Sequence, residues 1–296
     1  CGKESDDINN TCNKCKQVKY CNASCKKKHR KKHKEQCEEH VRLAAERAAE
    51  LYEEELFKQP PTLEDCPICF ERLPTLPTGR IYKSCCGKVI CSGCAYAPVY
   101  DNQGNVVAEN KCPFCRTPHP TSDEEAIERE KKRVEAGDTQ AMYNIGCDYR
   151  DERSGYTQNY TKALELWHRA AELGHSNAYN SIGIAYQYGR GVEVDLKKAS
   201  HYYELAAMKG NEVARCNLGC MERDAGNVGR AIKHFMIAVR DGEADSLEAI
   251  KELYSNGYAT KEDYTKALQS YQEYLTEIKS AQRDKAAAAD ATNRYY

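Results

Sequence analysis

The second half of the chain repeats a pattern of apolar and polar positions that is typical of paired helices. A basic residue followed by alanine recurs at steps of 36, 32 and 36 residues, as Lys162-Ala163, Lys198-Ala199, Arg230-Ala231 and Lys266-Ala267. A glycine followed by a polar residue recurs in the same register, as Gly137-Asp138, Gly174-His175, Gly210-Asn211 and Gly242-Glu243. Repeats of this period are typical of solenoids, in which each unit stacks on its neighbours.

Each repeat is predicted to contain two helices. Small residues recur midway through the first helix, at Gly146, Gly183 and Gly219, where we expect backbones to approach closely. Residues 138–280 therefore predict an α-solenoid of about four helical hairpins. Ser122, with Glu125 three residues later, is a capping-box start for a leading cap helix over residues 121–137. Residues 281–296 form a tail to which we assign no role.

The first half of the chain contains one predicted helix between two cysteine-rich stretches. Residues 41–58 lack Gly and Pro and are rich in Ala, Glu and Leu, and Pro60 and Pro61 end the helix. A linker helix over residues 41–60 therefore separates the stretches 1–40 and 62–120.

The cysteines change this picture from a purely helical one to a metal-stabilised one. The chain has 17 cysteines, of which 14 precede residue 116, mostly in C-x2-C or C-x3-C spacing. No secretory signal segment opens the chain and no apolar run approaches the roughly 18 residues of a membrane helix, so zinc is a better explanation than disulfides. We expect an intracellular protein, cytoplasmic or nuclear, without membrane contact. Because the sequence begins at Cys1 without Met, we expect it to be a fragment.

Residues 1–40 show zinc-ligand spacing, in the order Cys12-x2-Cys15, Cys21-x3-Cys25 and His33-x3-Cys37. So short a segment cannot bury enough apolar surface to fold alone, and two tetrahedral sites need eight ligands. Cys1 supplies a seventh ligand, and we expect the eighth to be a cysteine three residues upstream, which makes this module N-terminally incomplete.

The spacing resembles the MYND zinc finger, including the Tyr20-Cys21 step. The resemblance implies interleaved sites, with Cys1, Cys21 and Cys25 on one zinc ion and Cys12, Cys15, His33 and Cys37 on the other. His29 is a rival ligand, because it shares one helical face with Cys25, His33 and Cys37. MYND fingers bind proline-containing peptides, but the Trp usual in the family is Arg30 here.

Residues 62–120 hold eight more cysteines in a second pattern: Cys66, Cys69, Cys85, Cys86, Cys91, Cys94, Cys112 and Cys115. The steps Cys66-Pro67-Ile68-Cys69 and Cys112-Pro113-Phe114-Cys115-Arg116 resemble the two ends of a RING finger. The usual Cys-x-His is replaced by Cys85-Cys86-Gly87-Lys88, so an all-cysteine variant is the most economical interpretation. His119 is the spare donor if only one of the adjacent cysteines binds metal.

The RING resemblance implies ligand sets and roles. Cys66, Cys69, Cys91 and Cys94 would hold one zinc ion, and Cys85, Cys86, Cys112 and Cys115 the other. RING fingers are usually ubiquitin ligases that hold a ubiquitin-loaded conjugating enzyme in a reactive pose, a proximity effect. By resemblance, Ile68 and Pro113 contact the conjugating enzyme, and Arg116 hydrogen-bonds both partners. Tyr96, Val99 or Tyr100 must replace the usual groove Trp.

The helical repeats resemble the Sel-one-like repeats, relatives of the tetratricopeptide repeat. Gly189-Arg190-Gly191-Val192, followed by Asp195, matches the family's inter-helix loop. The first unit has Ser154-Gly155-Tyr156 there, and the third unit shortens the loop to Ala225-Gly226-Asn227. We expect Cys147, Cys216 and Cys220 to be small core residues, and His168, His201 and His234 to lie on solvated helix faces.

The overall charge of the chain excludes few functions, but one local run of residues is strongly basic. Lys and Arg total 44 against 45 Asp and Glu, for a net charge of −1. The run from Lys26 to Lys34 is strongly basic, but no aromatic residues interleave with it. We therefore expect a solvated helix face rather than a nucleic-acid site.

The sequence therefore predicts a mostly α fold with two small cross-brace zinc modules joined by a helix, then an α-solenoid of helical hairpins. We expect about four zinc ions per chain. The predicted function is a RING-type ubiquitin-protein ligase, with a ubiquitin-conjugating enzyme as partner and with the MYND-like finger and repeats recruiting protein or peptide substrates. The alternative is a non-enzymatic, zinc-dependent interaction scaffold.

Overall fold

A computed structural model describes residues 10–20, 23–60, 64–98, 103 and 111–296. The chain divides into two compact units, residues 1–58 and residues 59–296. Among the described residues, none of the helices is both long enough and apolar enough to cross a membrane.

The first unit consists of a short hairpin and one long helix. Strands β1 (Asn10–Thr11) and β2 (Lys19–Tyr20) pair antiparallel, and helix α1 runs over Ala23–Leu56. The helix predicted for residues 41–58 is thus the second half of a continuous helix that begins within the first cysteine-rich stretch. Its charged side chains pair along one face, for example Arg42 with Glu39 and Glu46 at 2.7 and 2.8 Å.

The second unit begins with a small module that has little regular structure. The 3-10 turn η1 (Pro77–Gly79) leads into β3 (Arg80–Lys83), which pairs antiparallel with β4 (Lys88–Cys91). Helix α2 (Ser92–Tyr96) follows β4 directly. The buried apolar residues here are few, Leu73 and Ile90 beside the cysteines Cys66, Cys91 and Cys94.

The rest of the unit is helical, which confirms the predicted fold class. A leading helix α3 (Asp123–Glu135) precedes hairpins of nearly uniform length. They are α4 (Thr139–Asp151), α5 (Tyr160–Glu172), α6 (Ser176–Tyr188), α7 (Leu196–Met208), α8 (Glu212–Asp224), α9 (Val228–Arg240), α10 (Ala244–Ser255) and α11 (Lys261–Ile278). After them come α12 (Ala281–Ala289) and the 3-10 turn η2 (Ala291–Asn293).

Glycines in the first helix of three hairpins make room for aromatic rings from the second helix. A Cβ atom on Gly146, Gly183 or Gly219 would lie 2.4, 2.6 and 2.4 Å from ring atoms of Trp167, Tyr203 and Phe235, respectively. The glycines therefore accept a buried ring, not the neighbouring backbone that the sequence pattern suggested. This packing repeats even in the hairpin α8–α9 with its shortened loop.

Side-chain caps start the repeat helices except α9. Asp138, Asn159, Asp195 and Asn211 each accept hydrogen bonds from backbone N–H groups one turn into their helix. Ser122 caps α3 as predicted, but the Glu125 carboxylate accepts from Thr121 rather than closing a capping box on Ser122.

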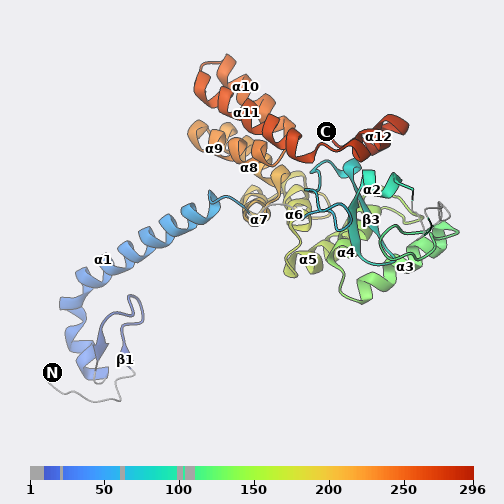
Figure 1. Cartoon of the computed structure of the whole chain (residues 1–296). Helices are drawn as coiled ribbons and strands as arrows, with labels where there is room; N and C mark the ends of the chain where they lie inside the picture. Colours follow the sequence, from blue (N-terminus) through green and yellow to red (C-terminus); the bar gives the residue numbers. More distant parts are fainter. Residues whose placement is uncertain (1–9, 21–22, 61–63, 99–102, 104–110) are drawn as a thin grey trace. The chain divides into compact units, whose positions relative to one another are not determined.

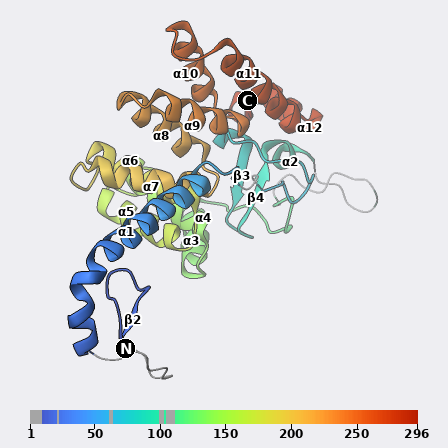
Figure 2. The same ribbon diagram turned by 90° about the vertical axis from the view of Figure 1, so that its left-hand side faces the viewer.

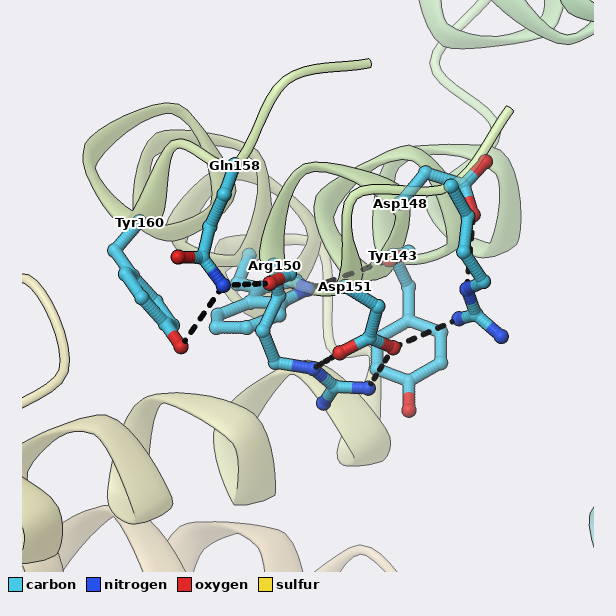
Figure 3. A network of polar contacts seen from close by, with 8 residues as sticks. Tyr143, Asp148, Arg150, Asp151, Gln158 and Tyr160 are labelled. Carbon is cyan, nitrogen blue, oxygen red and sulfur yellow. Dashed lines mark hydrogen bonds and ion pairs between the residues drawn. The ribbon is translucent and has the colours of Figure 1, made fainter. Parts of the chain in front are cut away.

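A polar network supports the first hairpin, whose inter-helix loop departs from the family pattern (Figure 3). Arg150 donates to Asp151 at 2.6 and 2.7 Å, and its guanidinium lies 5.8 Å from the Trp167 ring centroid. Gln158 donates to the Arg150 carbonyl at 2.9 Å. These hydrogen bonds connect α4 to the residues just before α5. They stabilise the first hairpin, whose loop departs from the family sequence.

The small module lies inside the arc of helices, as Figures 1 and 2 show for β3 and α2. At one end of the arc, Tyr82 on β3 donates to Asp138 at 2.9 Å. At the other end, Arg72 pairs with Asp241 at 3.0 Å and with Glu277 at 2.6 Å. The module thus contacts the turns between repeats, the positions of the recurring glycine-polar step.

The tail of residues 281–296, to which the sequence assigned no role, contains helix α12 and packs against the small module. Helix α12 packs against α2, and both Arg283 and Tyr295 are fully buried. The expectation for His234 was wrong, because it is fully buried on α9, where desolvation lowers its pKa to about 3. Cys147 and Cys216 are buried in the helical core as expected, and Cys220 is half-buried.

We expect Gly219→Ala to destabilise the repeats, because the new methyl group would meet the buried Phe235 ring. Overpacking of this kind costs about 1–3 kcal/mol. The matched control is Gly229→Ala on α9, where nothing lies within 4 Å of the added Cβ. This control is expected to stabilise by less than about 1 kcal/mol, because Gly229 is the second residue of α9 and helix propensity acts fully only in a helix interior. Chemical denaturation followed by circular dichroism measures both, and equal midpoints for the two variants would contradict the packing described.

Candidate metal centres

Three groups of four side chains each converge on one point. Their donor atoms lie within 4.8 Å of one another in each group. Cluster I is Cys12, Cys15, His33 and Cys37; cluster II is Cys66, Cys69, Cys91 and Cys94; cluster III is Cys85, Cys86, Cys112 and Cys115. The structure therefore brings together the same sets that the sequence resemblances implied.

A shared turn positions the first cysteine pair of clusters I and II and the last pair of cluster III. The residue after each C-x2-C step has a left-handed backbone, with φ of 56° at Lys16, 58° at Phe70 and 64° at Arg116. Each of these residues donates its N–H to the carbonyl of the first cysteine, at 3.0, 2.8 and 2.9 Å. This conformation is costly for a non-glycine residue and persists only where the surroundings fix it. The tight turn directs both sulfur atoms of a pair to the same side.

Cluster I is completed by α1. His33 and Cys37 are one helical turn apart and both are buried. The His33 Nε2 atom lies 3.3 Å from Cys15 Sγ, and Cys37 Sγ lies 3.5 Å from Cys12 Sγ. His29, the rival ligand, is exposed and stacks on the His33 ring instead of entering the cluster.

Cluster II is completed where β4 turns into α2. The Cys91 sulfur caps α2 by accepting the N–H of Cys94 at 3.3 Å. Cys69 Sγ lies 3.8 Å from Cys91 Sγ, and the Cys91 N–H donates to Cys66 Sγ at 3.4 Å. Two backbone N–H groups of cluster II therefore donate hydrogen bonds to sulfur atoms of the same cluster.

Cluster III draws both adjacent cysteines from the turn between β3 and β4. Cys85 Sγ lies 3.4 Å from Cys115 Sγ, and Cys86 Sγ lies 4.0 Å from Cys112 Sγ. Gly87, at φ of 70°, allows the tight turn that follows them. Lys88 and His119 are exposed and stand outside the cluster.

The donor geometry fits tetrahedral zinc. A Zn–S bond of about 2.3 Å places the sulfur atoms of a tetrahedral site about 3.8 Å apart. The sulfur–sulfur distances given above, from 3.4 to 4.0 Å, surround this value. They far exceed a disulfide bond, and each described cysteine is a free thiol.

Electrostatics of cluster II are consistent with a bound cation when all four sulfur atoms are ionised. In cluster II, a hydrogen bond from Cys91 lowers the pKa of Cys66 to about 4. Burial and the nearby Cys66 charge raise the pKa of Cys94 to about 12. One thiolate therefore suppresses ionisation of its neighbours, and only a bound dication lets all four ionise together. The clusters thus have the properties of zinc sites.

The other predicted site residues fall into two groups. Four of them lie outside the described residues: Cys1, Cys21, Val99 and Tyr100. The side chain of Cys25 also lies outside the described part. Ile68 and Pro113 are half-buried in the turns of clusters II and III, while Arg116 is exposed. Tyr96 is exposed on α2.

The sequence reasoning missed two exposed rings in the same turns. Phe70 is 78% exposed and follows Cys69, and Phe114 is 40% exposed and precedes Cys115. A single exposed ring is common on protein surfaces, but these two follow the predicted contact residues Ile68 and Pro113 closely in sequence. Their position beside each predicted contact residue is a signal that the sequence itself carried.

A basic hollow adjoins cluster III. A pocket of about 440 Å³ is lined by Ser84, Cys85 and Thr117 on the cysteine module and by Arg129, Lys132, Arg133 and Ala136 from α3 onward. Arg133 donates to the Ser84 carbonyl at 3.0 Å, and Arg129 pairs with Glu125 at 2.6 Å. The leading helix thus holds the module as well as the first repeat.

Comparisons with known proteins identify parts of the chain. The sequence matches the MYND finger family over residues 1–37 and the Sel1 repeat family over residues 139–175, 176–211 and 249–272. The gap in the Sel1 matches contains the hairpin with the shortened loop.

Curated relatives share short stretches. The ERAD-associated E3 ubiquitin-protein ligase component HRD3B of Arabidopsis thaliana is 42% identical over 64 residues, which is 22% of this chain and 11% of that protein. The E3 ubiquitin-protein ligase DA2 of the same plant is 34% identical over 81 residues, 27% of this chain and 18% of DA2. The chain therefore matches less than a fifth of these proteins' length in each case.

Among solved structures, a Sel1 repeat protein from Oxalobacter formigenes is 26% identical, with a TM-score of 0.43 over 57% of this chain and 65% of that chain. The two confirmed families account for separate parts of the sequence. The chain carries a MYND finger at residues 1–37 and Sel1 repeats within residues 139–272. The cysteine module between them contains clusters II and III, whose geometry is compatible with zinc binding.

Proposed function

We propose that this protein is a zinc-dependent, RING-type ubiquitin-protein ligase. The observation that carries the proposal is the interleaving of clusters II and III. Cluster II takes the first and third cysteine pairs of the module, and cluster III takes the second and fourth. This cross-brace is the arrangement that the RING resemblance implies.

The proposed activity needs no nucleophile from this chain. A conjugating enzyme carries ubiquitin as a thioester, and a substrate lysine attacks that thioester while the module holds the pose. We assign Ile68, Pro113 and the exposed Phe70 and Phe114 to the contact with the conjugating enzyme. Arg116 would donate hydrogen bonds to both enzyme and ubiquitin, for which its planar fork of donors is suited.

The MYND finger and the repeats would supply the substrate. Sel1 repeats mediate protein–protein interaction, and the relatives HRD3B and DA2 are named as a ubiquitin ligase component and a ubiquitin ligase. Both facts support recruitment of a protein by one part of the chain and transfer of ubiquitin by another. Zinc would hold all cysteine modules in their folded form, with three ions in clusters I–III and a fourth shared by Cys1, Cys21 and Cys25.

A non-enzymatic scaffold is the second candidate function. The observation that favours it is the contact between α12 and α2, the short helix that carries Tyr96, one of the candidates for the groove position. A module packed this closely against its own repeats would serve as a fixed part of an interaction platform.

Zinc content tests the metal part of the proposal. We expect the purified chain to contain at least three zinc ions by elemental analysis, one for each described cluster. Cys112→Ser should lower the content by about one ion, because it removes a thiolate from cluster III. Cys220→Ser, on α8 away from the clusters, is the control and should change nothing.

Chelation should then unfold the cysteine modules while the repeats stay helical, since each structural zinc contributes on the order of 10 kcal/mol to folding. Hydrogen exchange of residues 64–98 measures this directly. Unchanged protection after metal removal would contradict the proposal.

Arg116 tests the ligase part. In a reconstituted reaction with a panel of conjugating enzymes, we expect Arg116→Ala to reduce ubiquitin transfer at least tenfold with zinc content unchanged. Lys88→Ala is the control, because Lys88 is exposed on β4 and outside both clusters. A wild-type chain that binds zinc but transfers no ubiquitin with any enzyme of the panel would favour the scaffold.

A further inference from the structure

Helix α12 inserts a buried arginine beside cluster II. Arg283 is 0% exposed, although it lies about 190 residues from the nearest cysteine of the cluster along the chain. Buried arginines are rare unless their charge is paired. The surroundings of this guanidinium therefore need an explanation.

The guanidinium is only partly satisfied by oxygen atoms. Its Nη1 donates to the Ile278 carbonyl at 2.6 Å, and its Nη2 lies 3.8 Å from a Glu71 carboxylate oxygen, beyond hydrogen-bond distance. Within the described part of the chain, neither Nε nor Nη2 has a hydrogen-bond partner. Burial lowers the pKa of Arg283, but the nearby sulfur atoms of Cys91 and Cys69 and the Glu71 carboxylate raise it above its usual value, so the guanidinium lies beside the sulfur atoms of cluster II.

The backbone around Arg283 is shaped to allow this approach. A Cβ atom on Gly93 of α2 would lie 2.7 Å from the Arg283 nitrogen and 2.9 Å from the Gln282 carbonyl carbon. Gly93 therefore lets the two helices touch. On either side of it, Cys94 Sγ lies 3.7 Å from Gln282 Oε1, and Ser92 donates to the Asn293 carbonyl at 3.3 Å.

The charge of a zinc-loaded cluster II explains why a buried guanidinium lies beside it. Four thiolates and one Zn²⁺ carry a net charge of about −2, which a buried site must offset. A buried guanidinium beside those sulfur atoms offsets part of this charge and can donate N–H groups to the thiolates. Without metal and with neutral thiols, the same guanidinium would be a poorly paired buried cation.

We propose that Arg283 is an outer-sphere positioning residue of the cluster II zinc site, which makes residues 281–296 an integral part of the cysteine module. Zinc occupancy and docking of α12 are then coupled, so each stabilises the other. This inference rests on the zinc-binding part of the proposed function and is independent of ligase activity.

The test compares Arg283→Met with Arg294→Met in the full, zinc-loaded chain. Arg294 lies in the same segment with an exposed side chain. Zinc release to a chromogenic chelator should be roughly tenfold faster from one site of Arg283→Met, as is typical when an outer-shell partner is lost. Arg294→Met should match the wild type, and Arg283→Lys should fall between the two.

A spectroscopic measurement separates this role from a merely structural one. In the cobalt-substituted protein, loss of the N–H donor to sulfur should shift part of the thiolate-to-cobalt charge-transfer absorption to longer wavelength in Arg283→Met and not in Arg294→Met. Hydrogen exchange should also show residues 281–289 losing protection when wild-type zinc is removed.

The outcomes distinguish the two proposals. If the wild-type chain binds no zinc, the proposed function fails before Arg283 is tested. If zinc is bound but Arg283→Met and Arg294→Met release it alike with unshifted absorption, only the role of Arg283 is overturned.

Discussion

The close approach of four sulfur atoms is the constraint on which the cysteine modules depend. Thiolates at 3.4 to 4.0 Å repel one another strongly, and burial adds to the cost of ionising them. The apolar core beside them, Leu73 and Ile90, is too small to hold the turns together alone. The positions of β3, β4 and α2, and thus of every proposed contact residue, therefore follow from how sulfur atoms are brought to one centre.

The local parts of this structure were predictable from sequence because they rest on short-range chemistry. Cysteine spacing predicted which sulfur atoms form pairs, since the C-x2-C turn directs two sulfur atoms to one side regardless of the rest of the fold. Which pairs share a site was implied only by the family resemblances. The recurring glycines gave the correct hairpins for a partly different reason. Gly183 makes space for the Tyr203 ring, whereas the pattern alone suggested contact between backbones.

The long-range parts were not predictable in the same way. Nothing in the composition of residues 281–296 distinguishes Arg283 from the solvated arginines elsewhere, because its burial depends on Gly93 in a segment far away in sequence. His234 was misjudged for a similar reason, since a polar residue on an amphipathic helix is normally placed on the solvated face. The pairing of Arg72 with Asp241 likewise depends on how the module docks, and single-sequence patterns carry no docking information.

The module's contacts at Asp138 and Tyr274 lie on opposite ends of the helical stack. Tyr82 donates to Asp138 at the first repeat, and the Thr75 N–H donates to the Tyr274 hydroxyl on α11 at 2.9 Å. An open stack of hairpins can bend and extend along its length, because each repeat contacts only its neighbours. A module that contacts both the first and the last repeat limits that flexing and holds the two ends of the stack in place. A protein bound to these repeats would contact a surface whose curvature is already fixed. Loss of metal would then change the curvature of the stack at positions far from the sulfur atoms.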